Sequence, residues 1–386
     1  MLRPDGAKGK GGAEMKSRPS KVASPVDGNP TPEVVVQGAS FPVVAIGASA
    51  GGLDAYTEFF KALPRDLGMA FVVVQHLDPS HQSLLAGIIS KATTMPVEEV
   101  KSGVRIKPNC VYVNPPGAVM AISEGVFTLT PRSQGPGQHL AINFFMRSLA
   151  QDRKSRTIGI VLSGTGNDGA LGLADIKAEG GLTFAQDPAS SKYDGMPRSA
   201  IASGCVDIVL PPKGIARELE RITRHPYVKQ GQDEVEIAAP YSHKQDFNQV
   251  LDQLRKVTRV DFSQYKPNTL HRRTLRRMAV LKLDSMREYT EYLKEHRQEV
   301  QKLHDDVLIS VTSFFRDFEA FEALKSDAYP AIVKDKANKG SIRMWAPGCS
   351  TGEETYSLAI TLLERSRWCG RRYRVSSRRQ FWRELI

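Results

Sequence analysis

The sequence predicts an α/β protein whose largest part is a doubly wound parallel sheet, covered by helices on both faces. Between Phe41 and about residue 224, short apolar runs alternate with segments of helical periodicity, as in strand–helix–strand units. The strand runs are almost wholly apolar, which is typical of strands buried on both faces. After residue 244 the apolar spacing becomes that of helices, so an all-α part is expected to follow.

The predicted elements of the first part follow one another in a regular order. Strands are expected at 42–46, 70–74, 109–113, 119–122, 127–130, 157–162, 182–185 and 208–210. Helices are expected at 53–63, 83–91, 140–150 and 171–179. The turn-rich stretch 100–137 indicates a small antiparallel portion within the otherwise parallel arrangement.

Composition shifts divide the chain into six parts. These are a disordered leader rich in Gly, Pro, Lys and Ser (1–40), the α/β domain (41–224), a polar linker (225–244), a helical domain (245–338), the start of a further α/β unit (339–364) and a basic tail (365–386). In the helical domain, Phe247, Val250, Leu254 and Val257 keep the three-to-four spacing of a buried stripe. The further unit is expected to have a strand at 341–345 and a helix at 353–364.

Composition and charge exclude several classes of protein. No stretch approaches the ~18 apolar residues of a membrane helix, and no apolar signal segment is seen, so a cytoplasmic protein is expected. The net charge is +11, but residues 365–386 hold eight arginines against Glu384, which leaves +4 for residues 1–364. Neither nucleic acid binding nor membrane insertion is therefore expected. The four cysteines form no Cys-x-x-Cys pair, so neither a metal site nor a disulfide framework is predicted.

The first of three glycine-rich turns follows the predicted strand 42–46 and precedes a helix. It contains Gly47-x-Ser49-x-Gly51, a spacing that places a serine on a tight strand-to-helix turn with its hydroxyl exposed. The helix N-terminus behind it favours developing negative charge. Ser49 is therefore a candidate nucleophile, and a phosphate-cradling or purely structural turn is the alternative.

A histidine stands at the end of the next strand. His76 directly follows the run 70–74 and Gln75, so it is expected at the same sheet edge as the serine. Histidine has an unperturbed pKa near 6.5, which suits a general base near neutral pH. His81, at a predicted helix start, and His139, after a turn segment, are the rivals for this role.

The third turn, residues 163–169, has two readings. It matches Gly-x-Gly-x-x-Gly, with Asp187 placed eighteen positions further on where a ribose-binding acid of a dinucleotide site is expected. Against this, Asp168 puts an anion where a pyrophosphate needs the helix N-terminus. An aspartate there suits orienting an imidazole through its Nδ1–H and stabilising imidazolium.

Together the three turns place Ser49, His76 and Asp168 at one edge of a parallel sheet. The order Ser, His, Asp differs from the Ser, Asp, His order of α/β-hydrolases, so that fold is excluded. A triad is defined by the roles of its members, whatever their order. The pattern therefore indicates nucleophilic acyl transfer.

Four segments carry a resemblance to a known family. The turn around Ser49, QHLDPSH around His76, GTGNDG around Asp168 and GMPRSAI at 195–201 resemble the catalytic domain of bacterial chemotaxis protein-glutamate methylesterases. The resemblance covers residues 41–224. It implies that these three side chains are nucleophile, base and orienting carboxylate of an esterase.

The same resemblance implies more about the reaction. It places an oxyanion donor at the backbone N–H of Thr165, where the family usually has methionine. The implied substrate is the γ-methyl ester of glutamate on methyl-accepting chemotaxis receptors, with glutamine deamidation as a related activity. No cofactor is implied for this chemistry.

The second half of the chain resembles the chemotaxis receptor methyltransferase. The resemblance lies in WAPGCSTGEETYS from Trp345 onward, in VTSFFRD at 311–317, and in the helical stretch 245–300. It implies S-adenosylmethionine as cofactor, with Thr312, Arg316 and Glu354 as its contacts and Ser310 where asparagine is usual. After Glu364 the resemblance is expected to stop, so an incomplete cofactor-binding unit without transferase activity is predicted.

Some alternatives remain open from the sequence. The arginines of the helical domain either bind acidic receptor helices or form a solvated cationic face; they are Arg272, Arg273, Arg276 and Arg277. For the whole chain, the esterase hypothesis competes with a signalling scaffold without turnover, with a bifunctional esterase and methyltransferase, and with a dinucleotide-dependent oxidoreductase.

Overall fold

The structure is a computed structural model. It describes residues 41–77, 83–132, 140–229, 241–308, 314–315, 318–335, 342–347, 349 and 352–368. The expected leader (1–40) and most of the expected basic tail (365–386) lie outside these residues.

The α/β domain is built on a seven-stranded parallel sheet. In sheet order its strands are β3 (Val97–Glu99), β4 (Val111–Val113), β2 (Ala70–Gln75), β1 (Val43–Ala48), β7 (Thr157–Val161), β8 (Leu182–Gln186) and β9 (Ile208–Leu210). Every neighbouring pair is parallel. The chain leaves β1 toward β2 on one side and returns to β7 on the other, so the strand order reverses between β1 and β7. Such a switch point is where α/β sheets bind their ligands, at the carboxyl ends of the strands.

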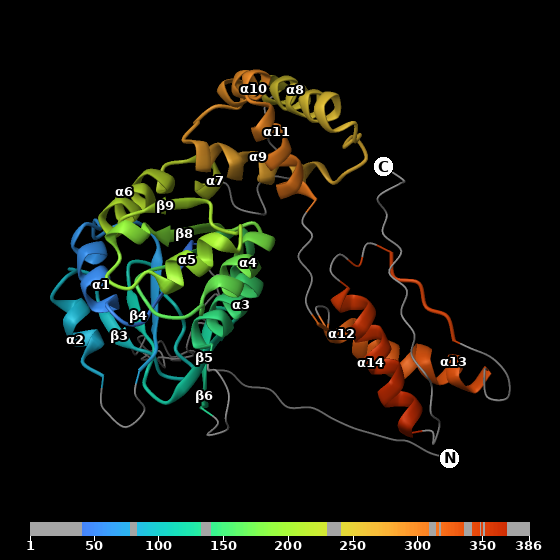
Figure 1. Cartoon of the computed structure of the whole chain (residues 1–386), viewed down its shortest axis with the longest axis horizontal. Coiled ribbons are helices and arrows are strands. Elements are labelled where there is room, and N and C mark those ends of the chain that lie inside the picture. The colour runs from blue at the N-terminus through green and yellow to red at the C-terminus, as the bar shows by residue number, and fades with distance from the viewer. Residues whose placement is uncertain are drawn as a thin grey trace, which may run out of the picture. The chain divides into compact units, whose positions relative to one another are not determined.

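Helices cover both faces of this sheet (Figure 1). One face carries α1 (Gly52–Lys61), α2 (Leu85–Ser90) and α6 (Pro212–Thr223); the other carries α3 (Ala141–Arg153), α4 (Ala170–Ala178), α5 (Gly195–Ala202) and the antiparallel hairpin of β5 (Ala118–Ser123) and β6 (Val126–Pro131). In β1, Val44 and Ile46 pack into the first layer, whereas Val43 and Ala45 pack into the second. The predicted doubly wound sheet and its antiparallel portion are therefore confirmed. The elements that the pattern did not predict are β3, α5 and α6.

The helical domain follows. It consists of α7 (Pro226–Lys229), α8 (Tyr241–Thr258), α9 (Pro267–Leu281), α10 (Met286–Glu295) and α11 (Arg297–Val307). Its core contains Val250 and Leu254 of the predicted stripe, packed with residues that include Tyr289 and Leu303. Helix α7 and the first residues of α8 fall inside the range that was expected to be a linker.

Three of the four arginines of α9 are buried. Arg276 is fully enclosed and pairs with Asp207, which precedes β9, and with Asp306 of α11. Arg277 donates two hydrogen bonds of 2.7 Å to the carboxylate of Glu299. Arg273 donates to the carbonyl oxygens at the end of α4. Both expectations for these three arginines, a receptor-binding face and a solvated face, are therefore wrong: their charges are used inside the fold.

The pKa shifts of this cluster follow from those pairs. Burial alone raises the pKa of the Asp207 carboxyl, but the charges of Arg276 and Lys177 outweigh burial and hold that pKa below its ordinary value. Burial likewise lowers the pKa of Arg276, and its two carboxylate partners more than reverse that effect. Asp207 and Arg276 are thus both ionised at neutral pH.

After residue 308 the described elements are helical. They are α12 (Phe318–Ala323), the π-helical turn η3 (Leu324–Ala328), α13 (Tyr329–Asp335) and α14 (Glu353–Trp368), with Tyr329 packed against Leu362. The helix expected at 353–364 is present as α14. The strand expected at 341–345 is not formed over residues 342–345. A strand needs a neighbour to pair with, and none is present among the described residues of this part.

Candidate active site

The residues that end β1 and β2 lie side by side at the carboxyl edge of the sheet. Ala48 of β1 is paired with Gln75 of β2, so Ser49 and His76 follow at equivalent positions on strands about 4.8 Å apart. The turn after β7, on the other side of β1, contributes Asp168. The switch point therefore brings the three predicted residues to one edge.

Two glycines let the turns around Ser49 approach each other. Gly51 has φ +73°, a conformation that side chains rarely adopt, and a Cβ there would lie 2.8 Å from Ser163 Oγ. A Cβ on Gly164 would lie 2.2 Å from the sulfur of Met196 and 3.0 Å from the Cβ of Ser49. The backbone at Gly164 thus packs directly against the serine. The next N–H, that of Thr165, has no hydrogen-bond partner among the described residues.

Asp168 is the most constrained member of the site. Its side chain is only 2% exposed. Oδ2 accepts the backbone N–H of Ile142 at 2.9 Å and faces His76 Nε2 at 2.8 Å. Oδ1 accepts the N–H groups of Asn143 and Gly169, each at 2.9 Å. The first turn of α3 therefore holds a carboxylate, as the positive end of a helix dipole favours.

The imidazole of His76 meets Asp168 through Nε2, whereas the sequence predicted a contact through Nδ1. The strand order explains this difference. β1 lies between β2 and β7, so the ring must reach across the end of β1 toward a carboxylate fixed on α3. Only the nitrogen farther from the backbone extends that far. An ionised carboxylate only accepts hydrogen bonds, so Nε2 carries the hydrogen and Nδ1 is left as the acceptor.

The described contacts of the third turn oppose the dinucleotide interpretation. Asn143 Oδ1 accepts the N–H groups of Gly169 and Gly172 at 2.9 and 2.8 Å, so amides at the start of α4 are already satisfied. Asp168 occupies the place of an anion. Asp187, the expected ribose ligand, instead caps the short helix at 188–190 by accepting the N–H of Ala189 at 3.1 Å.

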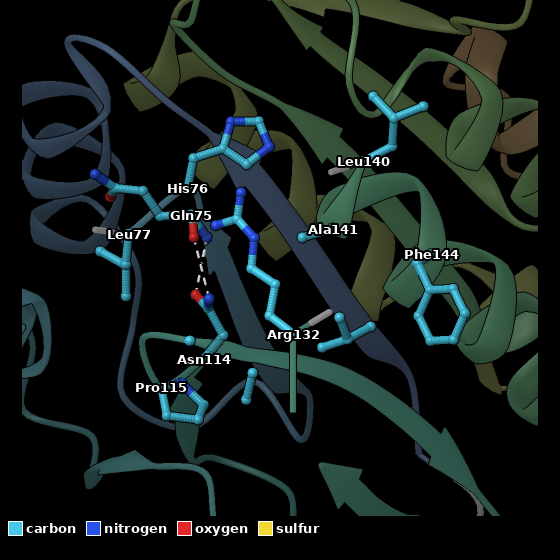
Figure 2. Close-up of a pocket in the computed structure, with 12 residues that line it drawn as sticks. Gln75, His76, Leu77, Asn114, Pro115, Arg132, Leu140, Ala141 and Phe144 are labelled. Carbon is cyan, nitrogen blue, oxygen red and sulfur yellow. Dashed lines mark hydrogen bonds between the residues drawn. The ribbon is translucent and has the colours of Figure 1, made fainter. Parts of the chain in front are cut away.

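Three further residues support the site, and the sequence motifs did not single them out. Asn114 exchanges two hydrogen bonds with the backbone of Gln75, at 2.9 and 3.0 Å, and so fixes the end of β2 just before His76 (Figure 2). Asn143 fixes the turn after β7, and Gln186 accepts the N–H of Ser163 at 2.8 Å. Asn114 directly follows a short strand, a signal that could have identified it. The other two act through contacts that only the folded chain makes.

The structure describes only some of the remaining predicted site residues. His81, His139, Thr312 and Arg316 lie outside the described residues. Glu354 is exposed in the first turn of α14. In the described part of the chain, no group of His, Cys, Asp and Glu is arranged to hold a metal ion, and no helix has the length and apolar character that crossing a bilayer requires.

Models of three protein families match the chain in succession. CheB methylesterase matches residues 44–219, the all-alpha domain of CheR methyltransferase matches 245–308, and the SAM binding domain of CheR methyltransferase matches 310–376. The first match contains Ser49, His76 and Asp168. The third contains Thr312, Arg316 and Glu354.

Individual relatives agree with these matches. A protein-glutamate methylesterase/protein-glutamine glutaminase of Carboxydothermus hydrogenoformans is 37% identical over 46% of this chain and 54% of its own length. One of Burkholderia pseudomallei is 36% identical over 51% of this chain and 57% of its own length. An uncharacterized 104.1 kDa protein of Rhodobacter capsulatus is 32% identical over 74% of this chain, but over 32% of its own length. The chain thus spans from just under a third to just over half of the length of these relatives.

Among solved structures, the CheB methylesterase catalytic domain of Thermotoga maritima is similar to this chain. The two are 31% identical, the match covers 48% of this chain and all of that domain, and the TM-score is 0.45.

Proposed function

Because this chain carries a CheB methylesterase domain followed by the all-alpha and S-adenosylmethionine-binding domains of CheR methyltransferases, we propose that it hydrolyses glutamate γ-methyl esters on chemotaxis receptors. The observation that carries the proposal is the bonded pair of His76 and Asp168 at the sheet edge beside Ser49. The products are methanol and a glutamate carboxylate.

In the first step, Ser49 Oγ attacks the ester carbonyl while His76 Nδ1 takes the hydroxyl proton. The buried carboxylate of Asp168 stabilises the imidazolium that forms, because it already accepts the Nε2–H. The N–H of Thr165 faces the developing oxyanion, a contact worth about 3 kcal/mol in such sites. The proton on Nδ1 passes to the methoxide oxygen as the ester bond breaks, so methanol leaves and an acyl-serine remains.

Water completes the cycle. His76 Nδ1 takes a proton from water as the oxygen attacks the acyl carbonyl, and it returns that proton to Ser49 as the acyl bond breaks. Each step conserves atoms without a cofactor. The same acyl-enzyme forms from a glutamine side chain if ammonia leaves in place of methanol, and relatives of this chain are named as glutaminases as well as methylesterases.

Substitution of Ser49 by alanine tests the proposal. Ser49→Ala is expected to lower methanol release from a methylated receptor by at least about 10⁴-fold, because the acyl-enzyme cannot form. Circular dichroism is expected to show an unchanged fold. Ser90→Ala is the matched control: this hydroxyl is exposed at the end of α2 and bonds only to the carbonyl of Gly87 among the described residues. If Ser49→Ala keeps the wild-type rate, the assignment is wrong, and an inactive wild type favours the scaffold hypothesis.

For residues 310–376 we propose that the chain supplies S-adenosylmethionine contacts but does not transfer methyl groups by itself. Glu354 stands in the first turn of α14, whereas the described residues after 308 form helices and no strand. Cofactor sites of this class lie at the edge of a sheet. Incubation with receptor and S-adenosylmethionine labelled in its methyl group is expected to leave the receptor unlabelled; incorporation of label contradicts the proposal.

A further inference from the structure

A pocket of about 360 Å³ opens beside His76. Its apolar wall includes Leu77, Val119, Leu140 and Phe144, and its polar lining includes Gln75, Asn114 and Arg132. In Figure 2 the Arg132 side chain runs from the end of the hairpin toward His76. The proposed catalytic imidazole and a cationic group therefore line the same pocket.

The Arg132 guanidinium is a charge without a described partner. Its backbone is fixed, because the Arg132 N–H donates to the carbonyl of Gly117 at 3.0 Å. The guanidinium itself makes no hydrogen bond or ion pair with another described residue, and Arg132 as a whole residue is partly buried. Asn114 is already engaged by Gln75, and the carboxylate of Asp168 is taken up by His76 and backbone amides. A carboxylate from outside is the group that best completes an arginine in such a place, through two parallel hydrogen bonds.

The carboxyl edge that holds the pocket exposes several large apolar side chains. Large apolar side chains are exposed at helix starts and loops along the carboxyl edge: Leu53, Leu84, Phe144, Leu171 and Tyr193. Phe144, which is 51% exposed, lies both on this edge and in the pocket wall. Apolar residues around a reactive site mark a contact with another polypeptide, whereas a free small ester needs none of them.

We infer that Arg132 determines specificity by binding an acidic side chain of the substrate protein next to the ester-bearing residue, while Phe144 receives apolar surface of the same protein. This inference rests on the proposed esterase function. The acidic residue lies within about 6 Å of the ester-bearing residue, the separation of neighbouring side chains on a helix or across a strand pair.

The experiment compares three esters. Two are peptides with one glutamate γ-methyl ester, flanked on neighbouring positions either by glutamate or by glutamine; the third is p-nitrophenyl acetate, which has neither acidic group. Wild type is expected to favour the acidic peptide over the neutral one by about 10–100-fold in kcat/KM, the range of a charge-assisted hydrogen bond. Arg132→Gln is expected to abolish that preference through KM and to leave turnover of p-nitrophenyl acetate unchanged.

Two variants sharpen the result. Arg132→Glu is expected to reverse the preference. Arg147→Gln on α3 removes the same charge from a residue paired with Asp175, and it is expected to keep the wild-type preference. A wild-type preference retained by Arg132→Gln, or an equal loss on all three esters, overturns the inference while the esterase proposal stands. A wild type that cleaves p-nitrophenyl acetate but neither peptide overturns the esterase proposal and this inference with it.

Discussion

The two edges of the parallel sheet use similar residues in different roles. At the carboxyl edge, Asp168 is 2% exposed and holds His76, whose side chain remains 35% exposed. At the amino edge, Asp207 is 1% exposed and holds Arg276, which is wholly enclosed. Each edge thus has a buried aspartate paired with a basic side chain. The two edges differ in whether the basic partner remains accessible to a ligand.

At the amino edge both charges of the Asp207–Arg276 pair are engaged inside the fold. Arg276 also donates to the carbonyl of Gly181 and pairs with Asp306, and Tyr227 donates its hydroxyl to the carbonyl of Ser155. At the carboxyl edge the side chain of His76 stays partly exposed, and only its Nε2 bonds to Asp168. A buried aspartate with a basic partner therefore indicates a functional site when one member remains accessible to a ligand. The number of charged residues nearby in the sequence does not decide this.

The largest expected effect is at the carboxyl edge. Asp168→Asn is expected to lower kcat for methyl ester hydrolysis by about 10⁴-fold, because an amide holds the imidazole in the wrong tautomer and does not stabilise imidazolium. The measurement is methanol release under saturating substrate. Asp207→Asn, the same change at equal burial, is the control and is expected to keep its kcat. Comparable kcat losses in the two variants contradict the division between the edges.

The sheet and its site edge were predictable because they depend on local pattern. Apolar runs such as 70–74 are buried on both faces, and a polar residue directly after such a run stands at the carboxyl edge whichever strands are neighbours. Ser49 and His76 directly follow β1 and β2 in this way, and Asp168 lies in the turn after β7. The ring nitrogen that binds Asp168 was not predictable, because it depends on β1 lying between β2 and β7.

The arginines of α9 show what a local pattern misses. Their spacing resembles a charged helix face, yet Arg273, Arg276 and Arg277 lie among the buried residues of α9. Their partners are separated by between 22 and 96 positions in the chain, so no local signal records them. Asn143 is similar: it acts on Gly169 from a helix 26 positions earlier. A pattern records which residues are polar but not which polar residues will meet.

The amino edge is expected to respond to mutation in stability. Asp207→Asn leaves the enclosed Arg276 with Asp306 as its remaining described carboxylate, and removal of one partner of a buried ion pair costs about 3 kcal/mol. Urea unfolding is expected to show this loss, while Asp305→Asn, on an exposed carboxylate of α11, changes stability by less than about 0.5 kcal/mol. Because the pKa of Asp207 is lowered in the fold, its contribution is present above about pH 4 and is lost as the pH falls below that value, so the variant and wild type are expected to converge in acid. A stability gap that persists unchanged in acid, or a variant as stable as wild type at neutral pH, contradicts the structural role of this pair.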